Sequence, residues 1–131
     1  MRNILSILLF CVAANGTSIC GCVLSTLLCQ GNEAMLNFYL NNFTDVTALQ
    51  NAVRNIPYRG GNTNTTGGLR LTRTEIFNAE NGDRLHVQDV AILITDGEPT
   101  REVDLLTGEV EAFKRSKIRI VGIGVTNQVR F

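Results

Sequence analysis

Two apolar runs of strand length, separated by one segment of helix length, constrain the fold of this chain more than any other feature. Val90–Thr95 (VAILIT) ends directly before Asp96, and Ile118–Val125 (IRIVGIGV) follows an amphipathic segment over 103–116. A continuous apolar run bounded by turn residues is typical of a strand buried on both faces of a parallel sheet. Strand, helix and strand with short connections predict a right-handed crossover, and therefore an α/β fold.

The chain before these runs predicts three more elements. Met35–Leu40 (MLNFYL) is rich in aromatic residues and alternates weakly, which indicates an edge strand. A helix capped by Thr44 or Asp45 is expected to end at Pro57, and a second helix over 69–79 to exit at Asn81-Gly82. The residues expected to face inward are Val46, Leu49, Val53 and Ile56 in the first helix, Leu69, Thr72, Ile76 and Phe77 in the second, and Leu105 or Leu106, Val110 and Phe113 in the third.

Composition and motifs exclude several functions. With 131 residues, 44% of them apolar, the chain fits one globular domain, and its twelve basic and twelve acidic residues give no basic surface for nucleic acid. His86 is the single histidine, and no Gly-x-Ser-x-Gly elbow occurs, so no nucleophile and base can be assembled. The glycine-rich loop over 60–68 has no following lysine for nucleotide phosphates. We therefore expect a protein that is not an enzyme and has no small-molecule substrate.

The first third of the chain has no charged residue between Arg2 and Glu33. Residues 1–16 have the positive start, apolar centre and small residues of a secretory signal peptide, with a signal anchor extending to residue 29 as the alternative. A third alternative is that this stretch is buried core of the fold. Residues 17–32 are interpreted as an apolar linker, and the four cysteines (Cys11, Cys20, Cys22 and Cys29) lie between residues 11 and 29.

Thr63 and Asp96 form the candidate metal site. Asp96 follows an expected strand at the sheet edge where α/β proteins bind ligands, and Thr63 lies in the loop Gly60–Gly68 (GGNTNTTGG), which opens a helix that could face it. Carboxylate and hydroxyl oxygens suit Mg²⁺, and glycines let the backbone approach an ion closely. The alternative is that both segments are only turns. Asn42-Phe43-Thr44 is a glycosylation sequon for a secreted chain, and further sequons begin at Asn15 and Asn64.

Four segments together resemble the von Willebrand factor type A domain, in particular the versions found in matrilins and collagen-associated chains. They are 38–45 (FYLNNFTD), 55–69 (NIPYRGGNTNTTGGL), 90–100 (VAILITDGEPT) and 118–125. The resemblance covers residues 33–131 and implies a doubly wound, Rossmann-like sheet with parallel central strands and a metal-ion-dependent adhesion site at its edge. It gives Thr63 the second-loop position of that site and Asp96 the third. By resemblance the chain is a secreted adhesion module whose partners are extracellular-matrix proteins such as collagens.

The chain departs from the family pattern at both ends. The Asp-x-Ser-x-Ser loop is absent from the sequence, and the polar stretch over 14–19 offers only Ser18 as a ligand. The sequence also lacks the family's first strand-helix-strand unit and its last strand and helix. Folding would therefore require the leader to serve as a strand or helix. The alternatives to a binding module are a truncated product without binding activity and a membrane-anchored interaction protein.

Overall fold

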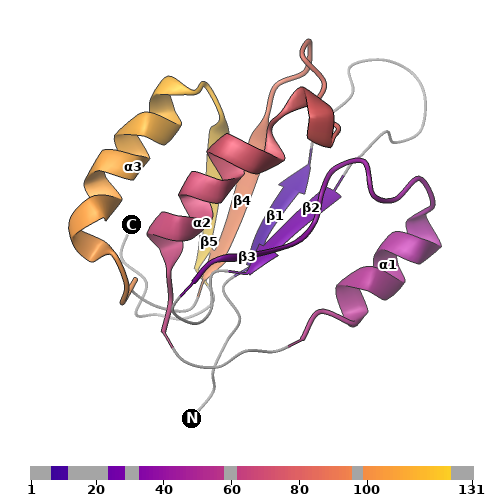
Figure 1. The fold of residues 1–131 in the computed structure, drawn as a ribbon, viewed down its shortest axis with the longest axis horizontal. Helices are drawn as coiled ribbons and strands as arrows, with labels where there is room; N and C mark the ends of the chain where they lie inside the picture. Colours follow the sequence, from indigo (N-terminus) through magenta and orange to yellow (C-terminus); the bar gives the residue numbers. More distant parts are fainter. Residues whose placement is uncertain (1–6, 12–23, 29–32, 58–61, 96–98, 125–131) are drawn as a thin grey trace.

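The computed structural model describes residues 33–57, 62–95 and 99–124, together with the backbone of 7–11 and 24–28. The described part is an α/β fold in which the helices labelled α2 and α3 in Figure 1 lie against one face of a five-stranded sheet. Its elements are β1 (Ile7–Cys11), β2 (Leu24–Leu28), β3 (Met35–Phe38), α1 (Val46–Arg54), α2 (Thr65–Leu71), β4 (Val90–Thr95), α3 (Val103–Arg115) and β5 (Arg119–Gly124). A π-helical turn (Thr72–Ile76) continues α2, and a 3₁₀ turn (Ala79–Asn81) follows it.

The strand order of the sheet is β3-β2-β1-β4-β5. β4 and β5 are parallel, with α3 as the connection between them, which confirms the strand-helix-strand unit that their sequence predicts. β3 forms one edge of the sheet, as expected for Met35–Leu40. The fold class predicted from the sequence is therefore confirmed.

The central position of the sheet belongs to β1, which comes from the apolar leader. Ile7–Cys11 pairs antiparallel with β2 on one side and with β4 on the other. β2 also lies N-terminal to residue 33, inside the stretch interpreted as a linker. The described backbone of the leader therefore includes a strand, and the antiparallel direction of that strand makes the sheet mixed.

The first helix, α1, begins and ends close to where its sequence predicts. Asp45 is its N-cap, and the Asp45 carboxylate accepts a hydrogen bond of 2.7 Å from the backbone N–H of Ala48. The helix ends at Arg54, three residues before Pro57. It lies at the periphery of the fold and buries none of its residues (Figure 1), and Val46, which was expected to face inward, is 66% exposed.

The second helix begins four residues earlier than the sequence predicts. Asn64 caps α2, so its first turn is built from the loop residues Thr65 to Gly68. Glycines in a helix are unfavourable, but here the N-cap requires one. A Cβ atom on Gly67 would lie 2.9 Å from the Asn64 Oδ1 atom, so the capping side chain needs the space that glycine leaves.

The core lies between the sheet and the pair α2 and α3. Its buried members are Leu40, Leu69, Ile76, Ala91, Phe113 and Ile118. Leu106 and Val110 of α3 pack against this cluster, whereas Leu105 is 50% exposed, which decides between Leu105 and Leu106 as the inward residue. β4 has buried residues at Ala91 and Thr95 and half-buried residues at its other positions.

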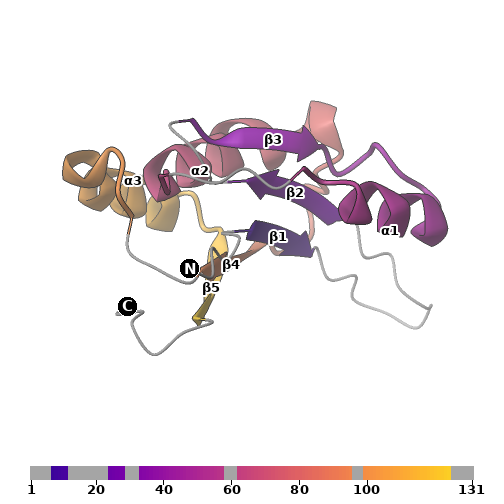
Figure 2. The ribbon, with the colours of Figure 1, turned by 90° about the horizontal axis from the view of Figure 1, so that it is seen from below.

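The prediction of a second fully buried strand over 118–125 is wrong. All six residues of β5 are exposed, although Ile118 just before the strand is buried. Within the described part of the chain, β5 has β4 as its one neighbour and forms the second edge of the sheet (Figure 2). An apolar run indicates burial only when a neighbour covers it, and here no described element does.

Candidate functional site

The candidate site lies at the carboxyl end of β4. The last residue of this strand, Thr95, is 6% exposed, and Asp96 follows it directly in the sequence. Asp96 itself lies outside the described residues, as does Ser18. The described part of the site therefore consists of the loop that contains Thr63 and the segment that resumes at residue 99.

Thr63 is bound on both sides of its backbone by the segment that follows the β4 loop. Its N–H donates to the Thr100 hydroxyl at 2.8 Å, and its carbonyl accepts from the backbone N–H groups of Thr100 at 3.0 Å and Arg101 at 3.2 Å. These bonds use the backbone of Thr63 and none uses its hydroxyl. The structure therefore places Thr63 beside the chain only a few residues after Asp96, as a shared site requires.

Asn64 fixes the start of α2 with both ends of its carboxamide. Its Oδ1 atom accepts from the Gly67 N–H at 2.7 Å, and its Nδ2 atom donates to the Glu102 carboxylate at 3.0 Å. Asn64 is 2% exposed, so these bonds form away from solvent. From the sequence, Asn64 was interpreted only as the first residue of a sequon. An asparagine directly before Thr-Thr is also an N-cap signal, and that signal would have identified it.

Glu102 connects the two loops of the site to each other. Its carboxylate binds Asn64 and also Arg70, at 3.0 Å, while its backbone carbonyl accepts from the Thr66 hydroxyl at 3.0 Å. The pKa of Glu102 is lowered, chiefly by the hydrogen bond from Asn64; burial, the next influence, raises it, and Arg70 and then Arg101 lower it further. Glu102 therefore stays ionised at neutral pH.

Glu102 makes these contacts from a strained backbone. Its φ of 49° lies in the left-handed region, which costs a residue with a side chain about 1 kcal/mol or more. The role of Glu102 in the site could not be predicted from the sequence, because glutamate seldom adopts this conformation. Its role becomes visible only when α2 and α3 are placed side by side.

A second ionic contact holds α2 and its π-helical turn against α3. The Glu109 side chain is 9% exposed and lies 2.9 Å from Arg73 and 3.6 Å from Arg70. A buried carboxylate is stable only when cations or N–H donors compensate it. Arg70 contacts both Glu102 and Glu109, so this ionic contact continues the loop contacts described above.

The described residues alone do not form a metal site. Across residues 33–57, 62–95 and 99–124, no three His, Cys, Asp or Glu side chains gather in a group that could hold an ion. Thr63 offers one neutral oxygen, and the neighbouring carboxylate of Glu102 is already bound to Asn64 and Arg70. A charged protein ligand for a metal at this edge would have to come from outside the described residues, where the predicted ligand Asp96 lies.

The two described sequons differ in accessibility. Asn42 lies in an exposed turn, where its Oδ1 atom accepts from the Tyr39 N–H at 2.7 Å. Asn64 is buried and uses both ends of its carboxamide in hydrogen bonds. A glycan on Asn64 is therefore incompatible with its contacts in the folded chain, whereas the exposed Asn42 could carry one.

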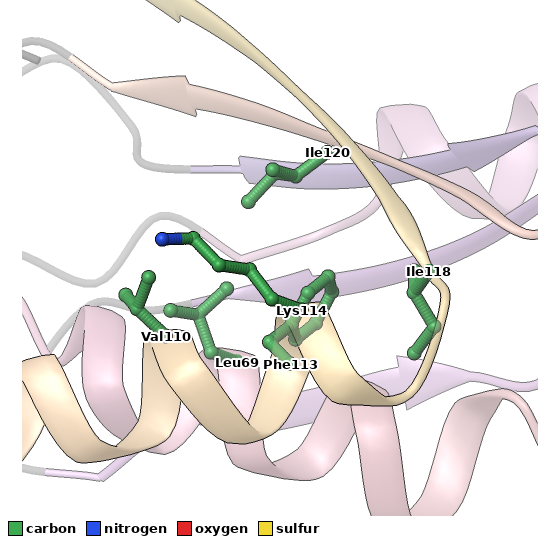
Figure 3. A pocket seen from close by; sticks show the side chains of 6 residues that line it. All are labelled: Leu69, Val110, Phe113, Lys114, Ile118 and Ile120. Atoms are coloured by element: carbon green, nitrogen blue, oxygen red, sulfur yellow. The ribbon is translucent and has the colours of Figure 1, made fainter.

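One pocket in the described part lies away from this edge, beside the start of β5. Residues of α2, α3 and β5 line it: Leu69, Val110, Phe113, Lys114, Ile118 and Ile120 (Figure 3). The lining is aliphatic and aromatic apart from Lys114, whose amine also lies 3.0 Å from Glu111. This pocket has no polar groups arranged for catalysis and does not include Thr63.

Fold and site together define a class of protein: a Rossmann-like α/β domain with two polar loops joined at the carboxyl end of β4. The profile of the von Willebrand factor type A domain matches residues 25–130. The chain belongs to this family. The match begins eight residues before the start that the sequence resemblance indicated, so it includes most of β2.

Relatives and solved structures agree with this assignment. The chain is 35% identical to Cuticlin-6 of Caenorhabditis elegans over 72% of its length, and 33% identical to Cochlin of Bos taurus over 59%. It is also 32% identical to the Collagen alpha-1(XII) chain of Notophthalmus viridescens over 67% of its length. The chain spans only 15%, 14% and 9% of these three relatives, respectively.

Among solved structures, proximal thread matrix protein 1 from the mussel byssus has the same fold. Its crystal form 2 aligns with a TM-score of 0.69 at 23% identity, over 76% of this chain and 26% of that protein. A second structure of that protein, with a zinc-occupied MIDAS motif, aligns with a TM-score of 0.68 at 21% identity, over 76% of this chain and 25% of that one.

Proposed function

We propose that this chain is a protein-binding module of the extracellular matrix, and that it binds through the edge where the Thr63 loop meets the segment after β4. The observation that carries the proposal is the pair of hydrogen bonds between the Thr63 backbone and Thr100, one to its hydroxyl and one from its N–H, which joins the two loops. The relatives support the kind of partner, because they include a collagen chain and a cuticlin, and the fold is shared with a matrix protein of mussel byssus. Collagens are the first partners to test.

We propose further that metal contributes little to this binding. Thr63 and Asp96 supply two protein ligands, of which one is charged, and the sequence has no Asp-x-Ser-x-Ser loop to supply more. Mg²⁺ keeps its waters unless several oxygens replace them, so its affinity here is expected to be weak. A bound cation would add positive charge at this edge and attract a carboxylate of the partner.

We propose that the module is exported from the cell, as the matrix relatives suggest. None of the helices in the described part of the chain is long and apolar enough to cross a membrane. Asn42 is exposed in a sequon and is the proposed glycosylation site. Detection of the chain in the medium of expressing cells, with a glycan at Asn42, would support export.

A binding experiment tests the proposal with single-residue variants of the full chain. Thr63→Ala and Asp96→Ala are expected to weaken binding to immobilised collagen, whereas Thr107→Ala, an exposed threonine on α3, should leave it unchanged. Equal binding by all three variants and the original chain would place the contact elsewhere on the molecule. Calorimetry with Mg²⁺ and Zn²⁺ tests the metal separately, and tight binding that depends on Asp96 would contradict the prediction of weak affinity.

A further inference from the structure

Asn81-Gly82 is a chemically reactive pair that the candidate functional site does not use. In an asparagine-glycine sequence the backbone nitrogen of the glycine can attack the side-chain Cγ atom of the asparagine, because glycine has no side chain to hinder the approach. The sequence contains two such pairs, Asn15-Gly16 and Asn81-Gly82. The second lies among the described residues, at the end of the 3₁₀ turn Ala79–Asn81.

The reaction replaces the carboxamide of the asparagine with a carboxylate. The Gly82 nitrogen loses its proton and forms a bond to the Asn81 Cγ atom, and the former amide nitrogen leaves as ammonia, which closes a succinimide ring. Water then opens the ring at one of its two carbonyl groups. The products are aspartate and isoaspartate, in which the main chain runs through the former side chain. Water is the one further reactant, and nothing is oxidised or reduced.

Hydrogen bonds in the folded turn hold both of the reacting groups. The Asn81 Nδ2 atom donates to the Glu75 carbonyl at 2.6 Å, which fixes the carboxamide. The Gly82 N–H donates to the Ala79 carbonyl at 3.3 Å, and this acceptor stabilises the protonated, unreactive form of the nitrogen. Ring closure also requires rotation about the Cα–C bond of Asn81 out of the helical range. The closed turn therefore opposes the reaction.

A residue far away in the sequence keeps this turn closed. Asn41, which lies before α1, donates from its Nδ2 atom to the Glu80 carbonyl at 3.1 Å. Gly82 has a φ of 96°, and a Cβ atom added to it would lie 2.8 Å from the backbone nitrogen of Asn41. The left-handed conformation and the close contact both require glycine here. The fold therefore requires the same glycine that makes the pair reactive.

We propose that Asn81 is a latent deamidation site, which the closed turn protects and which reacts only when the turn opens. Opening breaks the bonds from Asn81 to Glu75, from Gly82 to Ala79 and from Asn41 to Glu80. None of these bonds joins two core side chains. Local openings of this kind cost less free energy than unfolding of the whole domain, so they occur in the native protein.

The product of the reaction cannot restore the closed turn. A carboxylate in place of the Asn81 carboxamide has no N–H to donate, and its oxygen faces the Glu75 carbonyl, which is also an acceptor. The new negative charge also lies two residues before Asp83, and like charges repel each other. Each event therefore leaves a chain whose turn stays open, and modified chains accumulate with time.

Peptide mapping by mass spectrometry tests the proposal on the full chain during incubation at mildly alkaline pH. It measures how fast aspartate and isoaspartate form from Asn81 in buffer and in concentrated urea. The rate in buffer should be at least about tenfold lower than the rate in urea, because the turn is closed most of the time. Asn15-Gly16 is the internal reference in urea, where the two pairs should react at similar rates.

Amide hydrogen exchange tests the same point without a substitution. Exchange of the Gly82 N–H, followed by NMR under the same conditions, gives the fraction of time that the turn is open. The ratio of the Asn81 rates in buffer and in urea should equal this fraction within about threefold, because reaction follows opening. A ratio far above that fraction would mean that the closed turn reacts, and the proposal would be wrong.

Two variants with a matched control complete the test, and a thermal melt by circular dichroism checks that each one folds. Asn41→Ala removes the carboxamide that binds Glu80, so deamidation in buffer should become about fivefold faster, whereas Asn51→Ala, at an exposed position on α1, should not change it. Asn81→Asp reproduces one product and should lower the midpoint of unfolding by at least about 3 °C.

Three results would overturn the proposal. The first is an equal rate at Asn81 in buffer and in urea, or no reaction there in urea while Asn15 reacts. The second is a folded Asn41→Ala variant that deamidates no faster than the original chain. The third is an unchanged midpoint of unfolding in Asn81→Asp, because the product would then be compatible with the closed turn.

Discussion

Removal of the leader should abolish the cooperative folding of this domain. The perturbation is a chain of residues 17–131, the product expected from signal-peptide cleavage after residue 16. This deletion removes β1, which lies between β2 and β4, and so divides the sheet into the pairs β3-β2 and β4-β5. The comparison is with the full chain under the same conditions.

The size of the effect follows from the pairing of β1. Five of its residues are in register with β2 and four with β4, nine pairs in all. With about one hydrogen bond per antiparallel pair and a net contribution of about 1 kcal/mol per bond, the deletion removes about 9 kcal/mol. Small domains are stable by only about 5 to 15 kcal/mol, so the loss is comparable with the whole stability.

Thermal unfolding followed by circular dichroism measures the consequence. The full chain should melt cooperatively, and residues 17–131 should show no cooperative transition. A chain of residues 7–131 is the matched control, because it shortens the leader but keeps β1, and it should melt like the full chain. A cooperative melt of residues 17–131 within about 5 °C of the full chain would refute the reasoning, because β1 would then not be needed.

Three further predictions concern individual side chains. Asn64→Ala should lower the free energy of unfolding by about 2 kcal/mol in denaturant titrations, because the cap of α2 is lost and Glu102 loses a donor; a loss below about 0.5 kcal/mol would contradict this. The pKa of Asp89 is raised to about 6, chiefly by burial and next by the neighbouring Asp83. The folded chain therefore holds this proton more tightly than the unfolded chain does. Its stability falls as the pH rises from about 4 to 6. Asp89→Asn should flatten that pH dependence and stabilise the chain at pH 7 by about 1 kcal/mol after solvent screening, and an unchanged profile would exclude Asp89 as its source. Glycan analysis of chain secreted by eukaryotic cells should show loss of a glycan in Asn42→Gln and no glycan at Asn64; a glycan at Asn64 would contradict its burial.

Much of the fold follows from local sequence patterns. The apolar run at Val90–Thr95 and the amphipathic pattern over 103–116 predicted β4 and α3, and the capping residue Asp45 predicted the start of α1. These predictions succeeded because strand and helix periodicity and N-caps depend on residues only a few positions apart. The motifs also sufficed to identify the family, and Thr63 as a residue that lies beside the segment after β4.

The remaining features depend on residues far apart in the sequence. The place of the leader in the sheet depends on which strands it can pair with, and only the assembled sheet puts Ile7–Cys11 between β2 and β4. The exposure of β5 depends on its neighbours and not on its own apolar composition. Glu102 shows the same limit, because its contacts with Asn64 and Arg70 join residues more than thirty positions apart. Sequence alone determined β3, β4, α1, α3 and the family, because these depend on local patterns, and the tertiary structure decided which strand is central and which residues join the two loops.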